Sequence, residues 1–248
     1  MRELSGYDEL NITGTDTGVA IRLLDRLLSG QPQEHQPPST ALQMTADKRD
    51  EMLVSIYIQT FGPKVESTVR CSHCGASLDL DFSLKELQST VLKNAQADLI
   101  SQETNHCYVL PDGSKFRMLT GEDECAVAEM QPEEAVAELT SRSVLECAPT
   151  SSSEAIESAM ESVAPILDLE LVGKCTECET EQYYHFDIQS FLLSALMMER
   201  ETLILEVHRL ACTYGWNPDE ILRIPRSLRK TLVSLIESEV PAQWRDAR

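Results

Sequence analysis

Four cysteines occur as two closely spaced pairs of the kind that bind metal ions. The pairs are Cys71 with Cys74 and Cys175 with Cys178, each with two residues between the thiols. Two thiols at this spacing in a tight turn can bind one ion together, and Zn²⁺ prefers four such ligands in a tetrahedron. We therefore predict that both pairs bind one structural Zn²⁺ ion, which leaves no ligand position for a substrate.

The sequence around the first pair recurs around the second. Phe82 follows Cys74 at the same distance as Phe186 follows Cys178, so the offset between the two copies is 104 residues. Alternating apolar residues on both sides of each pair predict strands, with the cysteines in the turns of two β-hairpins. The predicted fold is α+β: a zinc-ribbon-like pair of hairpins clamped by one four-cysteine site, with a helical and hairpin insertion and flanking helices.

Other interpretations of these thiols remain open. The four cysteines could be core thiols without metal, or could hold iron in a rubredoxin-like redox site. His73 and His185 flank the pairs and could replace a cysteine ligand. The remaining cysteines are interpreted as buried free thiols; they are Cys107, Cys125, Cys147 and Cys212.

Hydrophobic periodicity and turn residues divide the chain into three parts. We predict a flexible N-terminal segment (1–44) with one amphipathic helix and a Pro-rich linker, a zinc-clamped body (45–190) with an insertion (85–165), and a helical C-terminal region (191–248). Residues 1–16 look loose and polar. Within the insertion we expect helices over 84–103, over 120–147 with a break near Pro132, and over 153–164, and a hairpin at 107–119. The run Asn217-Pro218-Asp219-Glu220 predicts a helix start.

Acidic residues outnumber basic residues, 41 to 21, and the formal net charge at pH 7 is −20. Basic side chains that neutralise phosphates supply most non-specific nucleic-acid affinity, so this charge disfavours nucleic acid as a partner. No run of about 18 apolar residues is present, which predicts no membrane span, and the N-terminus lacks the apolar core of a signal peptide. We expect a cytoplasmic protein with reduced thiols.

No constellation for catalysis stands out in the sequence. There is no Gly-rich phosphate loop and no nucleophile elbow. Glu206 and His208 are two residues apart, so on a helix their side chains diverge and cannot share a metal ion or a proton. His208 is better interpreted as an interface or partly buried histidine, and we expect no enzyme activity and no small-molecule substrate.

A basic cluster near the C-terminus is unusual in so acidic a chain. It consists of Arg223, Arg226, Arg229 and Lys230 around Pro225. Three interpretations remain open: a solvated helix face that balances the acidic body, a docking patch for an acidic protein, and a contact with DNA.

Several motifs resemble one known family. Glu206-Val207-His208 is followed by an apolar helix, Tyr214 and Trp216, and then by Asp219–Leu222 and Pro225; earlier, Phe61-Gly62 precedes an alternating strand into Cys71, Cys74 and Gly75. From about Thr45 onward, the chain resembles the zinc-ribbon baseplate proteins of contractile-tailed phages and related injection systems, often labelled baseplate hub assembly chaperones of the T-even type. One departure is Glu179, where the second cysteine pair lacks the glycine that follows the first.

The resemblance implies a binding function. It implies a non-enzymatic factor that assembles the baseplate or central hub of a contractile tail, as a chaperone or a baseplate component, by contacting hub or spike proteins. It places the protein in the cytoplasm of the producing cell or in the baseplate of the virion. The expected partner-binding residues are His208, Tyr214, Trp216, Arg223, Arg226 and Arg229. The alternative function is a zinc-ribbon adaptor for nucleic acid or the transcription machinery.

Overall fold

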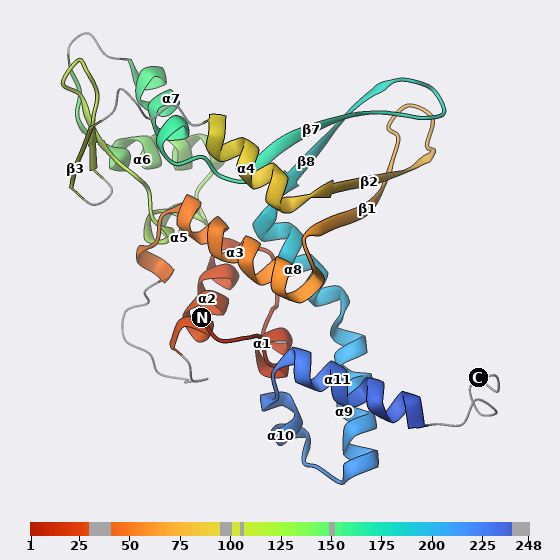
Figure 1. The fold of residues 1–248 in the computed structure, drawn as a ribbon. Helices are drawn as coiled ribbons and strands as arrows, with labels where there is room; N and C mark the ends of the chain where they lie inside the picture. Colours follow the sequence, from red (N-terminus) through yellow and green to blue (C-terminus); the bar gives the residue numbers. More distant parts are fainter. Residues whose placement is uncertain (30–40, 95–100, 105–106, 149–151, 240–248) are drawn as a thin grey trace. The chain divides into compact units, whose positions relative to one another are not determined.

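The computed structural model describes residues 1–29, 41–94, 101–104, 107–148 and 152–239. The chain divides into two compact units (Figure 1). Unit 1 combines both ends of the chain, Met1–Gln36 and Ser190–Arg248, and unit 2 is the segment between them, Pro37–Gln189. The Pro-rich linker predicted within residues 31–40 lies outside the described residues.

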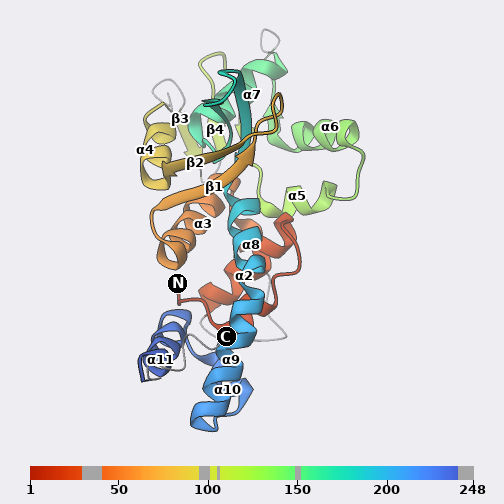
Figure 2. The ribbon, with the colours of Figure 1, turned by 90° about the vertical axis from the view of Figure 1, so that its right-hand side faces the viewer.

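Unit 1 is built from helices. They are α1 (Gly6–Leu10), α2 (Thr17–Ser29), α8 (Ile188–Met198), α9 (Arg200–Tyr214), α10 (Pro218–Arg223) and α11 (Arg226–Glu239). Figure 2 shows α9, α10 and α11 lying together. Their shared core contains Leu210, Ile221 and Val233.

The turns between these helices follow from a few residues. Gly215 ends α9 with a φ of 69°, a left-handed conformation that glycine adopts without strain. Asn217 then caps α10, because its side chain accepts a hydrogen bond of 2.9 Å from the Asp219 amide. Glu220 completes a capping box with Asn217, and Pro218 occupies the first turn. The predicted helix start at this run is confirmed.

The N-terminus is folded, so the expectation of a loose segment over 1–16 is wrong. Leu4 and Ile12 are buried, with exposed fractions of 3% and 1%. The Arg226 amide donates a hydrogen bond of 2.8 Å to the Leu4 carbonyl, and the Arg200 side chain donates one of 2.6 Å to the Leu10 carbonyl. Some partners of this segment are therefore at the other end of the sequence.

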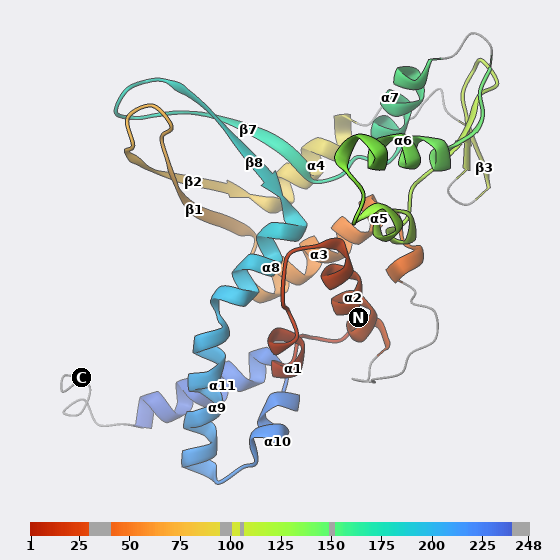
Figure 3. The ribbon, with the colours of Figure 1, turned by 180° about the vertical axis from the view of Figure 1, so that it is seen from behind.

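Unit 2 mixes helices and short strands, as the predicted α+β class requires. In order they are η1 (Ala41–Gln43), α3 (Ala46–Phe61), β1 (Lys64–Arg70), β2 (Ser77–Ser83), α4 (Leu84–Asn94), β3 (Ser101–Thr104), β4 (Cys107–Val109), β5 (Lys115–Arg117), α5 (Gly121–Val127), α6 (Pro132–Ser143), β6 (Val144–Glu146), α7 (Ser153–Val163), β7 (Asp168–Lys174) and β8 (Glu181–Asp187). Figures 1 and 3 show the β1–β2 hairpin beside the β7–β8 hairpin, and the β3 strand with α6 and α7 at the far end of this unit.

The insertion between the two hairpins contains a sheet of its own. Its strand order is β3-β4-β5-β6, all antiparallel. The predicted hairpin is its central pair, β4–β5, and Phe116 of β5 is fully buried against α7 residues such as Ile156. The two outer strands were missed: 101–103 and 144–147 were expected to be helical. They pair with the free edges of the central hairpin, whose exposed backbone groups favour added strands.

Helix α3 connects the insertion to the second hairpin. Asp50 accepts a hydrogen bond of 2.8 Å from the Leu167 amide, one residue before β7. Arg49, on the same helix, donates to both carboxylate oxygens of Glu124 on α5, at 2.9 and 2.7 Å. Helix α3 is thus joined by an ion pair to α5 and by a hydrogen bond to the residue that precedes β7. Within the described part of the chain, no helix is both long and apolar enough to cross a bilayer.

Candidate metal centre

The first cysteine pair lies in a tight turn between β1 and β2. The strands pair in register from Lys64↔Ser83 to Arg70↔Ser77. In the turn, the Cys71 amide donates a hydrogen bond of 2.8 Å to the Ala76 carbonyl. The Gly75 amide donates one of 3.0 Å to the Cys71 carbonyl. These bonds fold the chain back within a few residues and place both thiols on the same side of the turn.

The second pair lies in a turn of the same geometry. Strands β7 and β8 pair in register from Asp168↔Asp187 to Lys174↔Glu181, which is the first register shifted by 104 residues. The Cys175 amide donates a hydrogen bond of 3.0 Å to the Thr180 carbonyl, and the Glu179 amide donates one of 2.9 Å to the Cys175 carbonyl. Glu179 has a φ of 58°, close to the 74° of Gly75. The missing glycine changes the conformational cost of this turn and leaves its shape unchanged.

The two hairpins meet through equivalent residues. Cys71 Sγ lies 3.7 Å from Cys178 Sγ, and Cys74 Sγ lies 3.7 Å from Cys175 Sγ. Replacing each cysteine of the first contact by its equivalent in the other hairpin, 104 residues away, gives the second contact, so each hairpin presents the same donors to the other. Such reciprocal contacts define a local two-fold relation between the hairpins.

An aromatic contact obeys the same relation. Phe82 and Phe186, which occupy equivalent positions in β2 and β8, pack edge to face with ring centroids 5.1 Å apart. The edge-to-face arrangement is a favourable geometry for aromatic pairs. The hairpins therefore contact each other at two levels, through aromatic packing along the strands and through the cysteines at the turns.

The four sulfur atoms fit a tetrahedral metal ion. All four ligand atoms lie within 4.8 Å of one another. A Zn–S distance of about 2.3 Å implies sulfur–sulfur distances of about 3.8 Å, close to the 3.7 Å of the Cys71–Cys178 and Cys74–Cys175 contacts. Cys71 and Cys175 are buried, Cys178 is half-buried and Cys74 is exposed. The predicted convergence of Cys71, Cys74, Cys175 and Cys178 is confirmed, and the group can hold a metal ion.

Hydrogen bonds around the sulfurs favour the thiolate form of two cysteines. The backbone amide of Cys74 lowers the pKa of Cys71. The hydroxyl of Thr180, 3.3 Å from Cys178 Sγ, and the Thr180 amide lower the pKa of Cys178 to about 6. In Cys74 the Ala76 amide lowers the pKa, but partial desolvation and hydrogen bonds to the three neighbouring thiols together raise it to about 12. Four sulfurs this close need a cation before all of them can be thiolates.

One contact between the turns breaks the two-fold relation. The backbone amide and the hydroxyl of Ser72 both donate to Gln182 Oε1, each at 2.9 Å. Gln182 is 4% exposed, and the equivalent position in the first hairpin is Leu78. This bond between the hairpins was not predicted. Aligning the two halves at the 104-residue offset would have marked the position, because a polar residue, Gln182, stands where the first hairpin has Leu78.

The flanking histidines are not part of the cluster of ligand atoms that the described residues form. His185 lies on β8 with its Nε2 3.3 Å from an Asp168 carboxylate oxygen on β7. The expectation that the other cysteines are buried is also wrong. Cys125, Cys147 and Cys212 are exposed, and Cys107 is only half-buried.

The residues expected to bind a partner lie in unit 1 and fall into two groups. The first group is exposed. It contains His208 on α9, and Tyr214 and Trp216, whose rings stack with centroids 5.0 Å apart. Arg223 also belongs here, with its guanidinium 5.9 Å from the centre of the Tyr7 ring.

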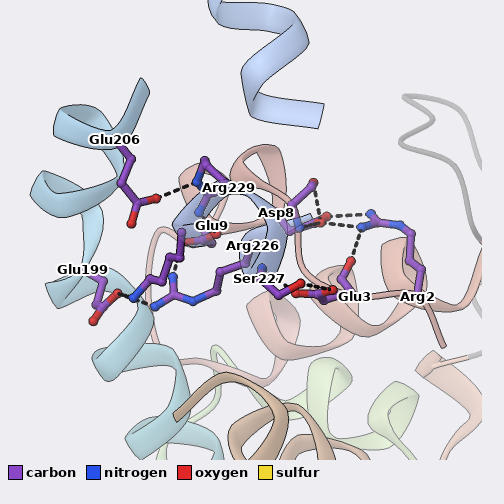
Figure 4. Close-up of polar contacts among 11 residues, drawn as sticks. Arg2, Glu3, Asp8, Glu9, Glu199, Glu206, Arg226, Ser227 and Arg229 are labelled. Carbon is purple, nitrogen blue, oxygen red and sulfur yellow. Dashed lines mark hydrogen bonds and ion pairs between the residues drawn. The ribbon is translucent and has the colours of Figure 1, made fainter. Parts of the chain in front are cut away.

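The second group is buried, which corrects the expectation of a solvated or docking surface. Arg226 and Arg229 are 4% and 0% exposed. Figure 4 shows both guanidinium groups directed toward carboxylates of α1 and α9. Their charges are neutralised inside unit 1, so these two arginines are not available to an acidic partner or to DNA.

The buried ion pairs connect the two ends of the chain. Arg229 donates to Glu206 Oε2 and to Glu9 Oε1, each at 2.6 Å. Arg226 forms ion pairs with Glu9 and with Glu199, and Lys230 donates a hydrogen bond of 3.0 Å to Glu199. Glu206, which the sequence pattern offered as part of a Glu-Val-His motif, therefore has a structural role.

A separate contact fixes the start of the chain. Asp8 receives hydrogen bonds from Arg2 at 2.6 and 2.8 Å, drawn in Figure 4, and from the Ser5 hydroxyl at 2.7 Å. Although burial acts to raise its pKa, these donors outweigh it and the pKa of Asp8 is lowered. The capping of α1 is thus coupled to an ion pair with Arg2.

Comparison with known proteins produced no match, whether to a family model, to a curated protein or to a solved structure.

Proposed function

We propose that this protein is a non-enzymatic, zinc-clamped binding protein that acts in assembly of the baseplate or central hub of a phage-type contractile tail. It acts as an assembly chaperone or as a baseplate component. The observation that carries the first half of the proposal is the convergence of the four cysteines, whose sulfurs lie within 4.8 Å of one another. The tail-assembly half is supported by the sequence resemblance.

A closed thiolate site favours a structural role for the metal. Cys71, Cys74, Cys175 and Cys178 would supply all four ligands of a tetrahedral Zn²⁺, whereas a catalytic zinc keeps a position for water or substrate. When bound, the ion joins two hairpins separated by about a hundred residues of sequence. Its contribution to folding in small modules is about 10–16 kcal/mol, which is enough to determine whether the hairpins stay together.

Exposed apolar side chains support a binding function. Val172 and Tyr183 are directly opposite each other in the second hairpin and are 59% and 62% exposed. In unit 1, the stacked pair Tyr214 and Trp216 is 41% and 39% exposed. Tyrosine and tryptophan are enriched among the residues that dominate protein interfaces. The Tyr214–Trp216 pair also belongs to the motif that resembles the baseplate family.

The charge distribution opposes the alternative of a nucleic-acid adaptor. Unit 2, which contains the metal centre, has 10 basic and 27 acidic residues, a net charge of −17, and unit 1 has 11 basic and 14 acidic residues, a net charge of −3. A surface as negative as that of unit 2 repels phosphate backbones.

Affinity purification from the producing cell, with zinc measured in the same sample, tests the proposal. We expect hub, spike or other tail proteins to be recovered, together with zinc bound to the bait. A Tyr214→Ala/Trp216→Ala variant should lose these partners and keep its zinc. A Val172→Thr/Tyr183→Thr variant, altered on the other exposed pair, tells which surface is used.

Different outcomes would contradict the tail-assembly function and the structural zinc site. Recovery of DNA, ribosomes or RNA polymerase without tail proteins, and a gel shift with a steep salt dependence, would replace tail assembly with the adaptor function. A coloured protein with iron in place of zinc would replace the structural clamp with a redox site.

A further inference from the structure

The outer face of α9 carries a thiol and an imidazole one helical turn apart. Cys212 Sγ lies 3.8 Å from Nδ1 and 3.8 Å from Nε2 of His208. Both side chains are exposed. The opposite face of the helix is buried through residues such as Leu203 and Leu210, so the pair is not part of the core.

The distance within this pair suits two ligands of one zinc ion. Zn–S and Zn–N distances of about 2.3 and 2.0–2.1 Å at a tetrahedral angle place sulfur and nitrogen about 3.6 Å apart. The observed distance of 3.8 Å is close to this value, and both side chains are exposed. Residues four apart on a helix face the same side, so no backbone change is needed.

Two ligands fill only half of a zinc shell. Among the residues that the structure describes, only the cysteine quartet of unit 2 brings three or more candidate ligands together. The pair on α9 therefore has no third ligand within its own described surroundings. The missing donors must come from water or from another molecule.

We propose that His208 and Cys212 are half of a second zinc site, which the same two residues of a second copy of this chain complete. Two copies related by a two-fold axis present identical donors to each other. The resulting shell of two thiolates and two imidazoles is a closed structural zinc site.

The residues around the pair suit contact between two copies. Ile204 and Leu205, one turn before His208, are 57% and 55% exposed. Leu205 and Cys212 are seven residues apart, so they lie on one face of the helix. Burying these apolar side chains against the partner's equivalent side chains would exclude water from the ion and add to the affinity.

Electrostatics permits this association through unit 1. With 11 basic and 14 acidic residues, unit 1 has a net charge of −3, against −17 for unit 2. Two copies therefore meet through the unit that carries little net charge, and the divalent ion adds positive charge at the interface.

A zinc titration of the full-length, fully reduced protein tests the inference. Sedimentation velocity would follow the mass while bound zinc is measured. The four-thiolate site of one chain should fill first and leave a monomer. Beyond one equivalent we expect a dimer, which is complete at about 1.5 zinc ions per chain because two chains share the second site.

Variants on α9 distinguish dimerisation through the metal site from non-specific hydrophobic association. Cys212→Ser and His208→Ala should each stop at one zinc ion per chain and remain monomeric. Leu205→Glu should weaken the dimer although the ligands remain. Cys147→Ser, which removes an exposed thiol elsewhere, should behave like the unaltered protein.

Several results would overturn the inference. They are saturation at one zinc ion per chain, a dimer that persists in Cys212→Ser or His208→Ala, and a dimer that reductant removes while zinc has no effect. The last result would indicate a disulfide between two Cys212 residues. None of these outcomes depends on tail assembly, so this inference and the proposed function can fail separately.

Discussion

At the scale of single residues, Glu179 adopts a backbone conformation that costs free energy. It is the one non-glycine residue with a positive φ, 58°, in the described part of the chain. We expect Glu179→Gly to raise the free energy of unfolding by about 0.5–1 kcal/mol, because relief of left-handed strain exceeds the entropy that glycine adds to the unfolded chain. Chemical denaturation at a fixed zinc concentration measures the difference.

The matched control exchanges the residues of the two turns. Gly75→Glu should lower the free energy of unfolding by about 0.5–1 kcal/mol, the same difference with the opposite sign. Nothing lies within 4 Å of a Cβ built at Gly75, so the cost would be conformational and not steric. Equal shifts in the same direction from both substitutions would refute the argument.

Asp50 makes stability depend on pH. Burial raises its pKa to about 7, although the Leu167 amide and Arg49 act to lower it; Asp187 and Glu124 raise it further. Between about pH 4 and 7 the folded protein holds this proton and the unfolded chain has lost it. The stability contributed by this group is therefore complete below about pH 4 and is lost as the pH rises through 7.

The Asp50→Asn variant tests this assignment, because the amide resembles the protonated carboxyl at every pH. We expect the variant to lack a loss of stability on the order of a few kcal/mol that the unaltered protein shows between pH 5 and 7.5. Urea denaturation at both values gives the numbers. Glu51→Gln, a change in a more exposed side chain one residue along α3, should retain the dependence. If Asp50→Asn retains it as well, Asp50 is not its source.

At the scale of elements, the metal should couple the two hairpins. Cys71→Ser and Cys178→Ser each remove one ligand from different turns. If the hairpins share one ion, each substitution alone should lower stability and bound zinc about as much as both together, because the site acts as a unit. Thermal unfolding and zinc content measure this, with Cys147→Ser as a control outside the cluster. Independent, additive losses would mean that the hairpins do not share an ion.

The buried ion pairs of unit 1 should matter more than the exposed ones. Arg229→Met leaves the carboxylates of Glu9 and Glu206 buried without this cation, a loss of about 3–5 kcal/mol. Arg209 of α9 also joins α9 to α11, through Glu237, but both side chains of this pair are more than one third exposed. Arg209→Met should cost about 0–1 kcal/mol by denaturant unfolding. Similar costs for both substitutions would argue against the role given to burial.

Local patterns predicted those elements whose cause is local. The cysteine spacing, the alternation around it and the Asn-Pro start of α10 each depend on a few neighbouring residues, and each was recognised. Strands β3 and β6 were missed because three or four residues carry little periodic signal, and their pairing is decided by the edges of β4 and β5.

At the scale of the whole molecule, the missing information was which distant segments meet. Glu9 and Arg229 are 220 residues apart, and nothing near either residue indicates the other. The arginines of the basic cluster were interpreted as surface residues because charged side chains are seldom fully buried without partners. Their shared partner Glu9 lies in α1, in a segment whose polar sequence suggested a loose end.

The division into two units leads to a prediction about metal removal. The cysteine cluster and the Phe82–Phe186 contact both lie in unit 2, whereas the core of Leu210, Ile221 and Val233 lies in unit 1. Chelation should therefore release the β1–β2 and β7–β8 hairpins and leave the α9–α11 core folded, since metal binding stabilises the part that supplies the ligands. Hydrogen exchange before and after chelation should show faster exchange in β1, β2, β7 and β8 and at the turn amides of Cys71 and Cys175, and unchanged protection in α9 and α11. Readdition of zinc should restore the protection of the strands.

Loss of protection in both units together would mean that the chain unfolds as one cooperative body, and that the ion stabilises far more than the two turns that bind it.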